Sequence, residues 1–166
     1  MYAARSDMGG GVILSQIHEF DYLYLLFGMP RRVFALGGHL SSLDIDVEDT
    51  ASILMDFSGV AVHLHQDYVQ RPPSRTLQII GDAGKIVADF RALEVRHFNA
   101  VGELAGLESH AGFERNSQFL DELKHFFACI DGSETPRVSL ADGAQSLRMA
   151  LAARQSLTSG KVIELT

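Results

Sequence analysis

The chain has 166 residues and a formal net charge of −7, with 14 basic against 21 acidic side chains. This acidic balance opposes attraction to phosphate, so nucleic acid and anionic membrane surfaces are poor candidates as partners. No apolar run reaches the ~20 residues that span a bilayer, and the start of the chain does not read as a signal peptide. Together with the single Cys129, which allows no intrachain disulfide, these features predict a cytoplasmic protein with one globular domain over residues 1–166.

The first predicted element is a helix that follows three consecutive glycines. Residues 1–11 read as an irregular lead-in, and apolar side chains then recur at helical spacing over residues 12–27. Gly28 and Pro30 mark the end of this helix.

The middle of the chain changes to the two-residue period of β-strands. Turn signals at Ser58-Gly59 and over residues 81–84 are short enough for hairpins, which join antiparallel strands. Residues 99–112 contain glycine and are weakly patterned, so we predict a loop there. The predicted strands cover residues 32–40, 50–57, 60–69, 76–80, 85–90 and 93–98.

Two helices and a short strand are expected to follow. One apolar stripe extends over residues 119–130. Ser139 with Asp142 three positions later predicts a capping box for a second helix, whose apolar stripe is Leu140, Ala144, Leu147 and Leu151. Gly160 ends that helix, and a last strand over residues 161–165 is expected at the sheet edge.

This order of elements defines an α+β fold, with helices packed on one face of a predominantly antiparallel sheet. The other face of the sheet stays open, and it is either solvated or an interface.

His18 is the strongest candidate for chemistry. Histidine is suited to proton transfer near neutral pH, and Gly10 and Gly11 just before it allow the close approach of a ligand. General acid/base catalysis on an alcohol fits this arrangement, and a partly buried structural histidine is the alternative. Asp21, three residues after His18, is near enough along the helix to contact it. For both Glu19 and Asp21 we favour structural or solvated roles, because acids are expected in the first turns of a helix.

A second polar cluster lies on the strand over residues 60–69. His63, His65 and Asp67 alternate along it, so they share one face, and two imidazoles with a carboxylate suit zinc. We nevertheless expect no metal, because an isolated H-x-H pair on an exposed sheet face is usually polar surface. A metal-dependent hydrolase is therefore the least favoured alternative.

The loop after this strand carries two arginines. Pro72 and Pro73 stiffen it, and Arg71 and Arg75 are able to hold a carboxylate, phosphate or sugar hydroxyls. A plain hairpin connection with surface arginines is the alternative. We find no Ser-His-Asp arrangement, P-loop or G-x-G-x-x-G motif in the sequence.

The run GGGVILSQIHEFDYLYLLFG at residues 9–28 resembles the start of the C-terminal domain in the Gfo/Idh/MocA family of NAD(P)-dependent sugar and polyol dehydrogenases. The hairpin IIGDAGKIVADF and the ending VSLADGAQSLRMALAARQSLTSGKVIEL extend the resemblance over most of the chain. It implies that His18 meets the reacting hydroxyl of a carbohydrate-like substrate, and that copies of the chain pair through the open sheet face. One departure concerns the aspartate that the family often carries three or four residues before this histidine, where Ser15 and Leu14 stand here.

The resemblance also implies a larger enzyme. The family's Rossmann domain and its catalytic lysine in a Glu-Lys-Pro motif match nothing in this sequence, and we expect them before Met1. NAD or NADP would bind mainly there, so we expect neither cofactor binding nor turnover by this chain alone. It would then be the substrate-binding and oligomerisation domain of an oxidoreductase that transfers a hydride between NAD(P) and a sugar, polyol or related hydroxy compound. A non-catalytic binding or oligomerisation module is the alternative.

Overall fold

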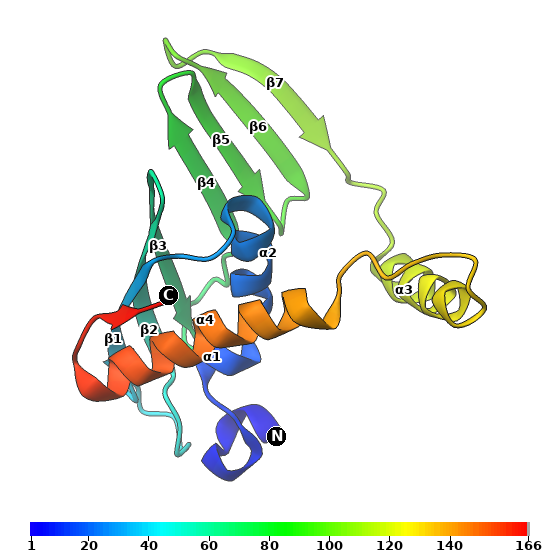
Figure 1. Ribbon diagram of the computed structural model, residues 1–166. Coiled ribbons are helices and arrows are strands. Elements are labelled where there is room, and N and C mark those ends of the chain that lie inside the picture. The colour runs from blue at the N-terminus through cyan, green and yellow to red at the C-terminus, as the bar shows by residue number, and fades with distance from the viewer. Residues whose placement is uncertain (166) are drawn as a thin grey trace. The chain divides into compact units, whose positions relative to one another are not determined.

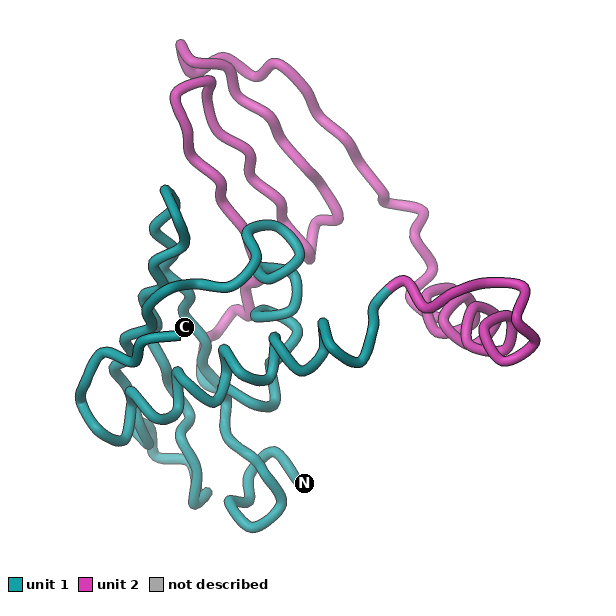
Figure 2. The backbone as a smooth tube through the Cα atoms, in the orientation of Figure 1, with its two compact units in different colours: residues 1–69, 138–166 teal, residues 70–137 magenta. Residues whose placement is uncertain are grey.

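The computed structural model describes residues 1–165 of the chain. It divides into two compact units, the first formed by Met1–Val69 with Val138–Thr166 and the second by Gln70–Arg137 (Figure 2). Helices combine with antiparallel strands throughout (Figure 1), which confirms the predicted α+β class. The strands form two four-stranded sheets, one in each unit. Within residues 1–165, no helix has the length and apolar character required to cross a bilayer.

The sheet of the first unit has the strand order β3-β2-β1-β8. The hairpin at Ser58-Gly59 joins β2 to β3 as predicted, and β8 pairs with β1 at the sheet edge, also as predicted. The strands are β1 Arg32–Gly38, β2 Thr50–Phe57, β3 Val60–Asp67 and β8 Ile163–Glu164.

The predicted helix over residues 12–27 is interrupted. The structure has α1 at Val12–Ser15 and α2 at His18–Phe27, preceded by two 3₁₀ turns at Tyr2–Ala4 and Ser6–Met8. The break lies at Gln16, whose carbonyl oxygen accepts a hydrogen bond from Gln66 Nε2 of β3 at 3.0 Å. Gln16 has φ −112° and ψ 37°, outside helical geometry, and α2 begins two residues later with His18 at its start.

Helix α4 spans Leu140–Ser159 and has the caps that the sequence predicts. The Ser139 hydroxyl accepts from the Asp142 backbone N–H at 3.1 Å, and the Asp142 carboxylate accepts from the Ser139 N–H at 2.9 Å. Gly160 ends the helix in the left-handed conformation at φ 65°.

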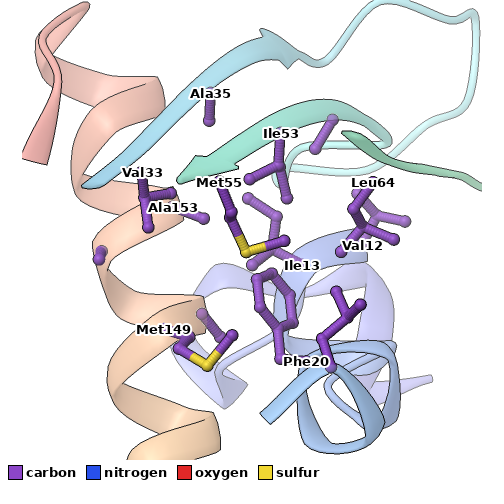
Figure 3. Packing of buried hydrophobic residues seen from close by; sticks show 14 of the residues in the cluster. Val12, Ile13, Phe20, Val33, Ala35, Ile53, Met55, Leu64, Met149 and Ala153 are labelled. Atoms are coloured by element: carbon purple, nitrogen blue, oxygen red, sulfur yellow. The ribbon is translucent and has the colours of Figure 1, made fainter. Parts of the chain in front are cut away.

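Three helices cover one face of the first sheet and enclose the core. Helix α4 packs on β1 and β8, α1 packs on β2 and β3, and α2 lies against α4. In Figure 3, Met149 of α4 and Phe20 of α2 point toward Met55 of β2. The buried cluster comprises Val12, Ile13, Phe20, Leu23, Val33, Ala35, Ala51, Ile53, Met55, Phe57, Leu64, Met149, Ala150, Ala152 and Ala153. This core fixes the two short helices that carry the candidate site.

The second unit contains a sheet of order β4-β5-β6-β7 and helix α3 at Arg115–Ile130. The prediction of a loop over residues 99–112 is wrong at β7, Leu104–Ser109, which pairs with β6. Gly106 and exposure on both faces remove the alternation that would have identified this strand. The other strands are β4 Thr76–Gly81, β5 Gly84–Asp89 and β6 Glu94–Asn99.

The second unit differs from the first in having no core. None of its residues, all of which the structure describes, is buried. The apolar stripe predicted for α3 is present, but its side chains are exposed, with Phe127 at 58% and Ile130 at 64%.

Candidate functional site

The candidate site begins at His18, the first residue of α2. Its side chain is 52% exposed, whereas the side chain of the next residue, Glu19, is only 8% exposed. The two are in contact, with His18 Nε2 lying 3.0 Å from Glu19 Oε1. A half-exposed imidazole therefore has a buried carboxylate on one side and solvent on the other.

Glu19 has a second partner one helical turn further on. The Tyr22 hydroxyl donates a hydrogen bond to Glu19 Oε2, so the two carboxylate oxygens are directed at different groups. A buried carboxylate needs such partners, because its transfer out of water is otherwise strongly unfavourable. Its place in the first turn of α2 adds the favourable field of the helix N-terminus. We refer to His18, Glu19 and Tyr22 as the histidine cluster.

Asp21 serves the placement of α2 rather than the imidazole. The Ser146 hydroxyl of α4 donates to Asp21 Oδ1 at 2.8 Å. One turn further along, the Tyr24 hydroxyl donates to Asp142 Oδ1 at 3.3 Å. Hydrogen bonds from the Ser139 hydroxyl and backbone lower the pKa of Asp142, so its carboxylate stays charged at this contact. These bonds fasten the helix that carries His18 to α4.

The two glycines singled out as substrate contacts are packed against this chain itself. A Cβ on the buried Gly10 would lie 2.6 Å from the carbonyl oxygen of Tyr2 and 2.7 Å from that of Arg5. Gly11 has φ 106°, and a Cβ there would overlap the carboxylate of Glu48. Both positions thus require glycine because other groups lie too close for a Cβ atom. Within the described residues, those groups are carbonyls and a carboxylate of the protein itself.

The same segment does not fit the phosphates of a dinucleotide cofactor. The N–H groups of Gly10 and Gly11 already donate to the carbonyls of Arg5 at 2.8 Å and Ala3 at 3.0 Å. The neighbouring Glu48 carboxylate adds negative charge, which repels phosphate. The strand pairs of the described residues are antiparallel, so they lack the parallel strand–glycine–helix unit that cradles a pyrophosphate.

Arg71 and Arg75 belong to the second unit. The Arg75 guanidinium carbon lies 4.6 Å from the centroid of the Phe90 ring, and the Phe90 N–H donates to the Arg75 carbonyl at 3.0 Å. Stacking on an aromatic ring restrains the guanidinium. Arg71 precedes Pro72 in the connection between β3 and β4.

The exposed face of β3 contains an arrangement that the sequence search missed. His65 Nδ1 lies 2.9 Å from Ser52 Oγ on the neighbouring strand, and His65 Nε2 lies 3.3 Å from Asp67 Oδ2. The hairpin register pairs Ser52 directly with His65, a pairing that already follows from the turn predicted at Ser58-Gly59.

This Ser-His-Asp cluster lacks the other parts of a hydrolytic site. Ser52 lies on β2, which pairs with β1 on one side and β3 on the other, so within the described sheet the ladders use the backbone N–H groups around its hydroxyl and leave none for an oxyanion hole. His63 faces the same side from a position opposite Leu54. Within residues 1–165, no group of three or more histidine, cysteine or acidic side chains has a geometry suited to a metal ion.

The structure is an antiparallel α+β domain with a half-exposed histidine beside a buried acid, and sequence comparison identifies the family to which it belongs. The chain matches the Gfo/Idh/MocA C-terminal domain over residues 2–87, just over half its length. It belongs to the Gfo/Idh/MocA family.

Three relatives show what the chain is similar to. Myo-inositol 2-dehydrogenase of Thermotoga maritima is 30% identical over 173 aligned positions, covering 95% of this chain and 50% of that protein. The UDP-N-acetylglucosamine 3-dehydrogenase of Acidithiobacillus ferrooxidans superposes with a TM-score of 0.70 at 23% identity, covering 88% of this chain and 46% of its own. The WlbA dehydrogenase of Bordetella pertussis, solved with NADH and UDP-GlcNAcA, gives 0.70 at 21% identity, with 95% and 46% covered. The chain thus spans about half the length of the relatives that it matches.

Proposed function

We infer that this chain is the substrate-binding and oligomerisation domain of an NAD(P)-dependent oxidoreductase that acts on a sugar, polyol or related hydroxy compound. The observation that carries the proposal is the half-exposed His18 beside a buried carboxylate, in a domain of the Gfo/Idh/MocA family. The inositol and nucleotide-sugar dehydrogenases among its relatives support the substrate class. The single free Cys129 agrees with a reducing compartment, and we place the protein in the cytoplasm.

His18 would move the proton of the reacting hydroxyl. An imidazole that takes this proton during oxidation, and returns it during reduction, acts as a general base and a general acid in turn. Bound NAD or NADP would supply hydride chemistry, and the described residues lack a cradle for its phosphates, so the cofactor would depend mainly on protein outside them. This chain would therefore bind the substrate and handle the proton.

Arg71 and Arg75 are the side chains that we propose for substrate binding. A guanidinium presents several N–H donors in a fixed plane, which suits the hydroxyl, carboxylate or phosphate oxygens of sugar derivatives. Gly10 and Gly11 would contribute indirectly, by letting the backbone at the start of α1 pack closely, because neither position tolerates a side chain.

Steady-state kinetics of the complete protein that carries this chain will test the proposal. Reduction of NAD+ and NADP+ is measured by absorbance with myo-inositol, other polyols and UDP-sugars as substrates. We expect His18→Ala to lower kcat by about 10²–10⁴-fold with little change in thermal stability. Replacement of His110, an exposed histidine of the second unit, is the matched control. Unchanged turnover in His18→Ala would overturn the assignment. Sugar binding without turnover by the unaltered protein would favour a non-catalytic module.

The uncovered face of the first sheet is our proposed surface for homo-oligomers. Leu36 and Leu54 lie on it at 61% and 54% exposure, and the core residues of the same strands point to the opposite side. A charge placed there should oppose sheet-to-sheet association. We expect sedimentation velocity to show an oligomer that Leu54→Glu dissociates, while Leu140→Glu, at a 92% exposed site of α4, leaves it intact. A strictly monomeric unaltered protein at high concentration would contradict the proposal.

A further inference from the structure

The burial of Glu19 calls for a physical explanation. Its side chain is 8% exposed, yet it lies beside a histidine that is 52% exposed. Helix α2 buries Phe20 and Leu23 in the core, and Glu19 shares a helical face with Leu23, four residues later. An apolar residue at position 19 would extend this buried face, so a carboxylate there gives up apolar packing that such a residue would provide.

The partners of Glu19 indicate what it does. Its Oε2 accepts the hydrogen bond of Tyr22, which holds the carboxylate in one orientation, and its Oε1 is then directed to His18 Nε2 at 3.0 Å. The positions three and four residues before the histidine, Ser15 and Leu14, carry no carboxylate. Glu19 is accordingly the acid that this chain presents to the imidazole.

We propose that Glu19 is the positioning residue of His18, and that Tyr22 fixes Glu19 in turn. This inference rests on the proposed function, in which His18 handles the proton of the substrate hydroxyl. A carboxylate beside Nε2 favours the tautomer with hydrogen on Nε2, which leaves the lone pair on Nδ1. Among the described residues, Nδ1 of His18 has no hydrogen-bonding partner. The proton would leave the substrate oxygen and form the Nδ1–H bond, and Glu19 would face the resulting positive charge.

Nitrogen-15 NMR of the imidazole tests the positioning without any enzymatic assay. The signals of His18 in histidine-labelled protein are identified by their loss in His18→Ala. We expect the neutral ring to hold its hydrogen on Nε2, and Glu19→Gln to move the two nitrogen shifts in opposite directions, toward those of free histidine. The matched control is Asp21→Asn, which removes an acid that bonds to Ser146 and should leave both shifts unchanged. Free-histidine shifts in the unaltered protein, or shifts that Glu19→Gln does not move, would overturn the proposal.

A second variant keeps the test decisive if Glu19→Gln does not fold. Tyr22→Phe deletes one hydroxyl and retains the ring, and it should move the His18 shifts in the same direction by a smaller amount. Unmoved shifts in Tyr22→Phe would then overturn the proposal.

A double-mutant cycle in the complete enzyme separates this inference from the proposed function. We expect Glu19→Gln to lower kcat by about 10–100-fold with KM little changed, and to lower it no further once His18 is alanine, because Glu19 acts through His18. A full effect of Glu19→Gln in the His18→Ala background would indicate a structural role and refute the positioning. If His18→Ala itself leaves turnover unchanged, the proposed function fails. The NMR experiment would still show whether Glu19 positions the His18 imidazole.

Discussion

Acid should destabilise the connection between β1 and β2 through one carboxylate. The side chain of Asp49 is fully buried, and its oxygens accept hydrogen bonds from the backbone N–H groups of Leu40 at 2.9 Å and Ser41 at 3.1 Å. The hydroxyls of Ser41 and Thr50 add bonds of 2.6 and 3.0 Å. Burial by itself raises the pKa of Asp49, but these four donors outweigh it and lower the pKa from 3.8 to about 2.

This lowered pKa sets the sign and size of the effect on stability. Because the folded protein holds the Asp49 proton more weakly than the unfolded chain does, ionised Asp49 stabilises the fold above pH 3.8, and that stability is lost as the pH falls toward 2. A shift from 3.8 to about 2 corresponds to about 2 kcal/mol of unfolding free energy. Roughly half of this contribution should be gone at pH 3.

Urea unfolding followed by circular dichroism at pH 7, 5, 4 and 3 measures this contribution. Asp49→Asn should be less stable than the unaltered protein at pH 7 by about 1–3 kcal/mol, because the N–H donors of the new amide would face N–H and O–H groups that are themselves donors. It should also lose less stability between pH 5 and pH 3. The matched control is Asp44→Asn, in the same connection but exposed, which should follow the unaltered protein. Equal pH dependence in Asp49→Asn and the unaltered protein would refute the reasoning.

Three further substitutions test the frame around the site by urea unfolding. Gly11→Ala should lower the free energy of unfolding by about 1–3 kcal/mol, because φ is 106° and the new Cβ meets a carboxylate. Gly9→Ala, with open space around its Cβ, should lower it less. Equal losses of stability in the two variants would contradict the steric argument. Met149→Ala removes a fully buried side chain and should cost about 2–5 kcal/mol, against less than about 0.5 kcal/mol for the exposed Leu140→Ala. Ser139→Ala should cost about 1 kcal/mol by removing the capping box of α4, and an unchanged midpoint would show that the cap is dispensable.

Local signals in the sequence predicted the parts of the fold that local physics controls. The capping box at Ser139, the left-handed stop at Gly160 and the two short hairpins all depend on residues close in sequence, and each is present in the structure. The break at Gln16 was missed because nothing local marks it, and the Gln16 carbonyl has a tertiary partner, Gln66, fifty positions away. Strand β7 was missed because neither of its faces is buried.

In the candidate site too, local sequence signals identified one residue and missed another whose role depends on tertiary packing. His18 could be selected because glycines and a helix start lie beside it in sequence, but the role of Glu19 depends on which side of α2 faces the core. The helix dipole explains an acid in the first turn and says nothing of its burial. The usable signal was the spacing of Glu19 and Leu23, which places the carboxylate on the apolar face.

Helices α3 and α4 show where sequence patterning stops being sufficient. Both were predicted from apolar stripes of the same kind, and both exist. In α4 the predicted stripe is on the wrong face, since Leu140, Leu147 and Leu151 are 92%, 43% and 47% exposed, and the buried face carries Met149 and Ala153 instead. In α3 the stripe is exposed as well, with Phe127 at 58%. Helices in proteins draw most of their stability from packing of an apolar face rather than from helix propensity. Periodicity therefore predicted that both helices exist, but the face that is buried depends on a second surface, which α4 has in β1 and α3 has not within the residues described.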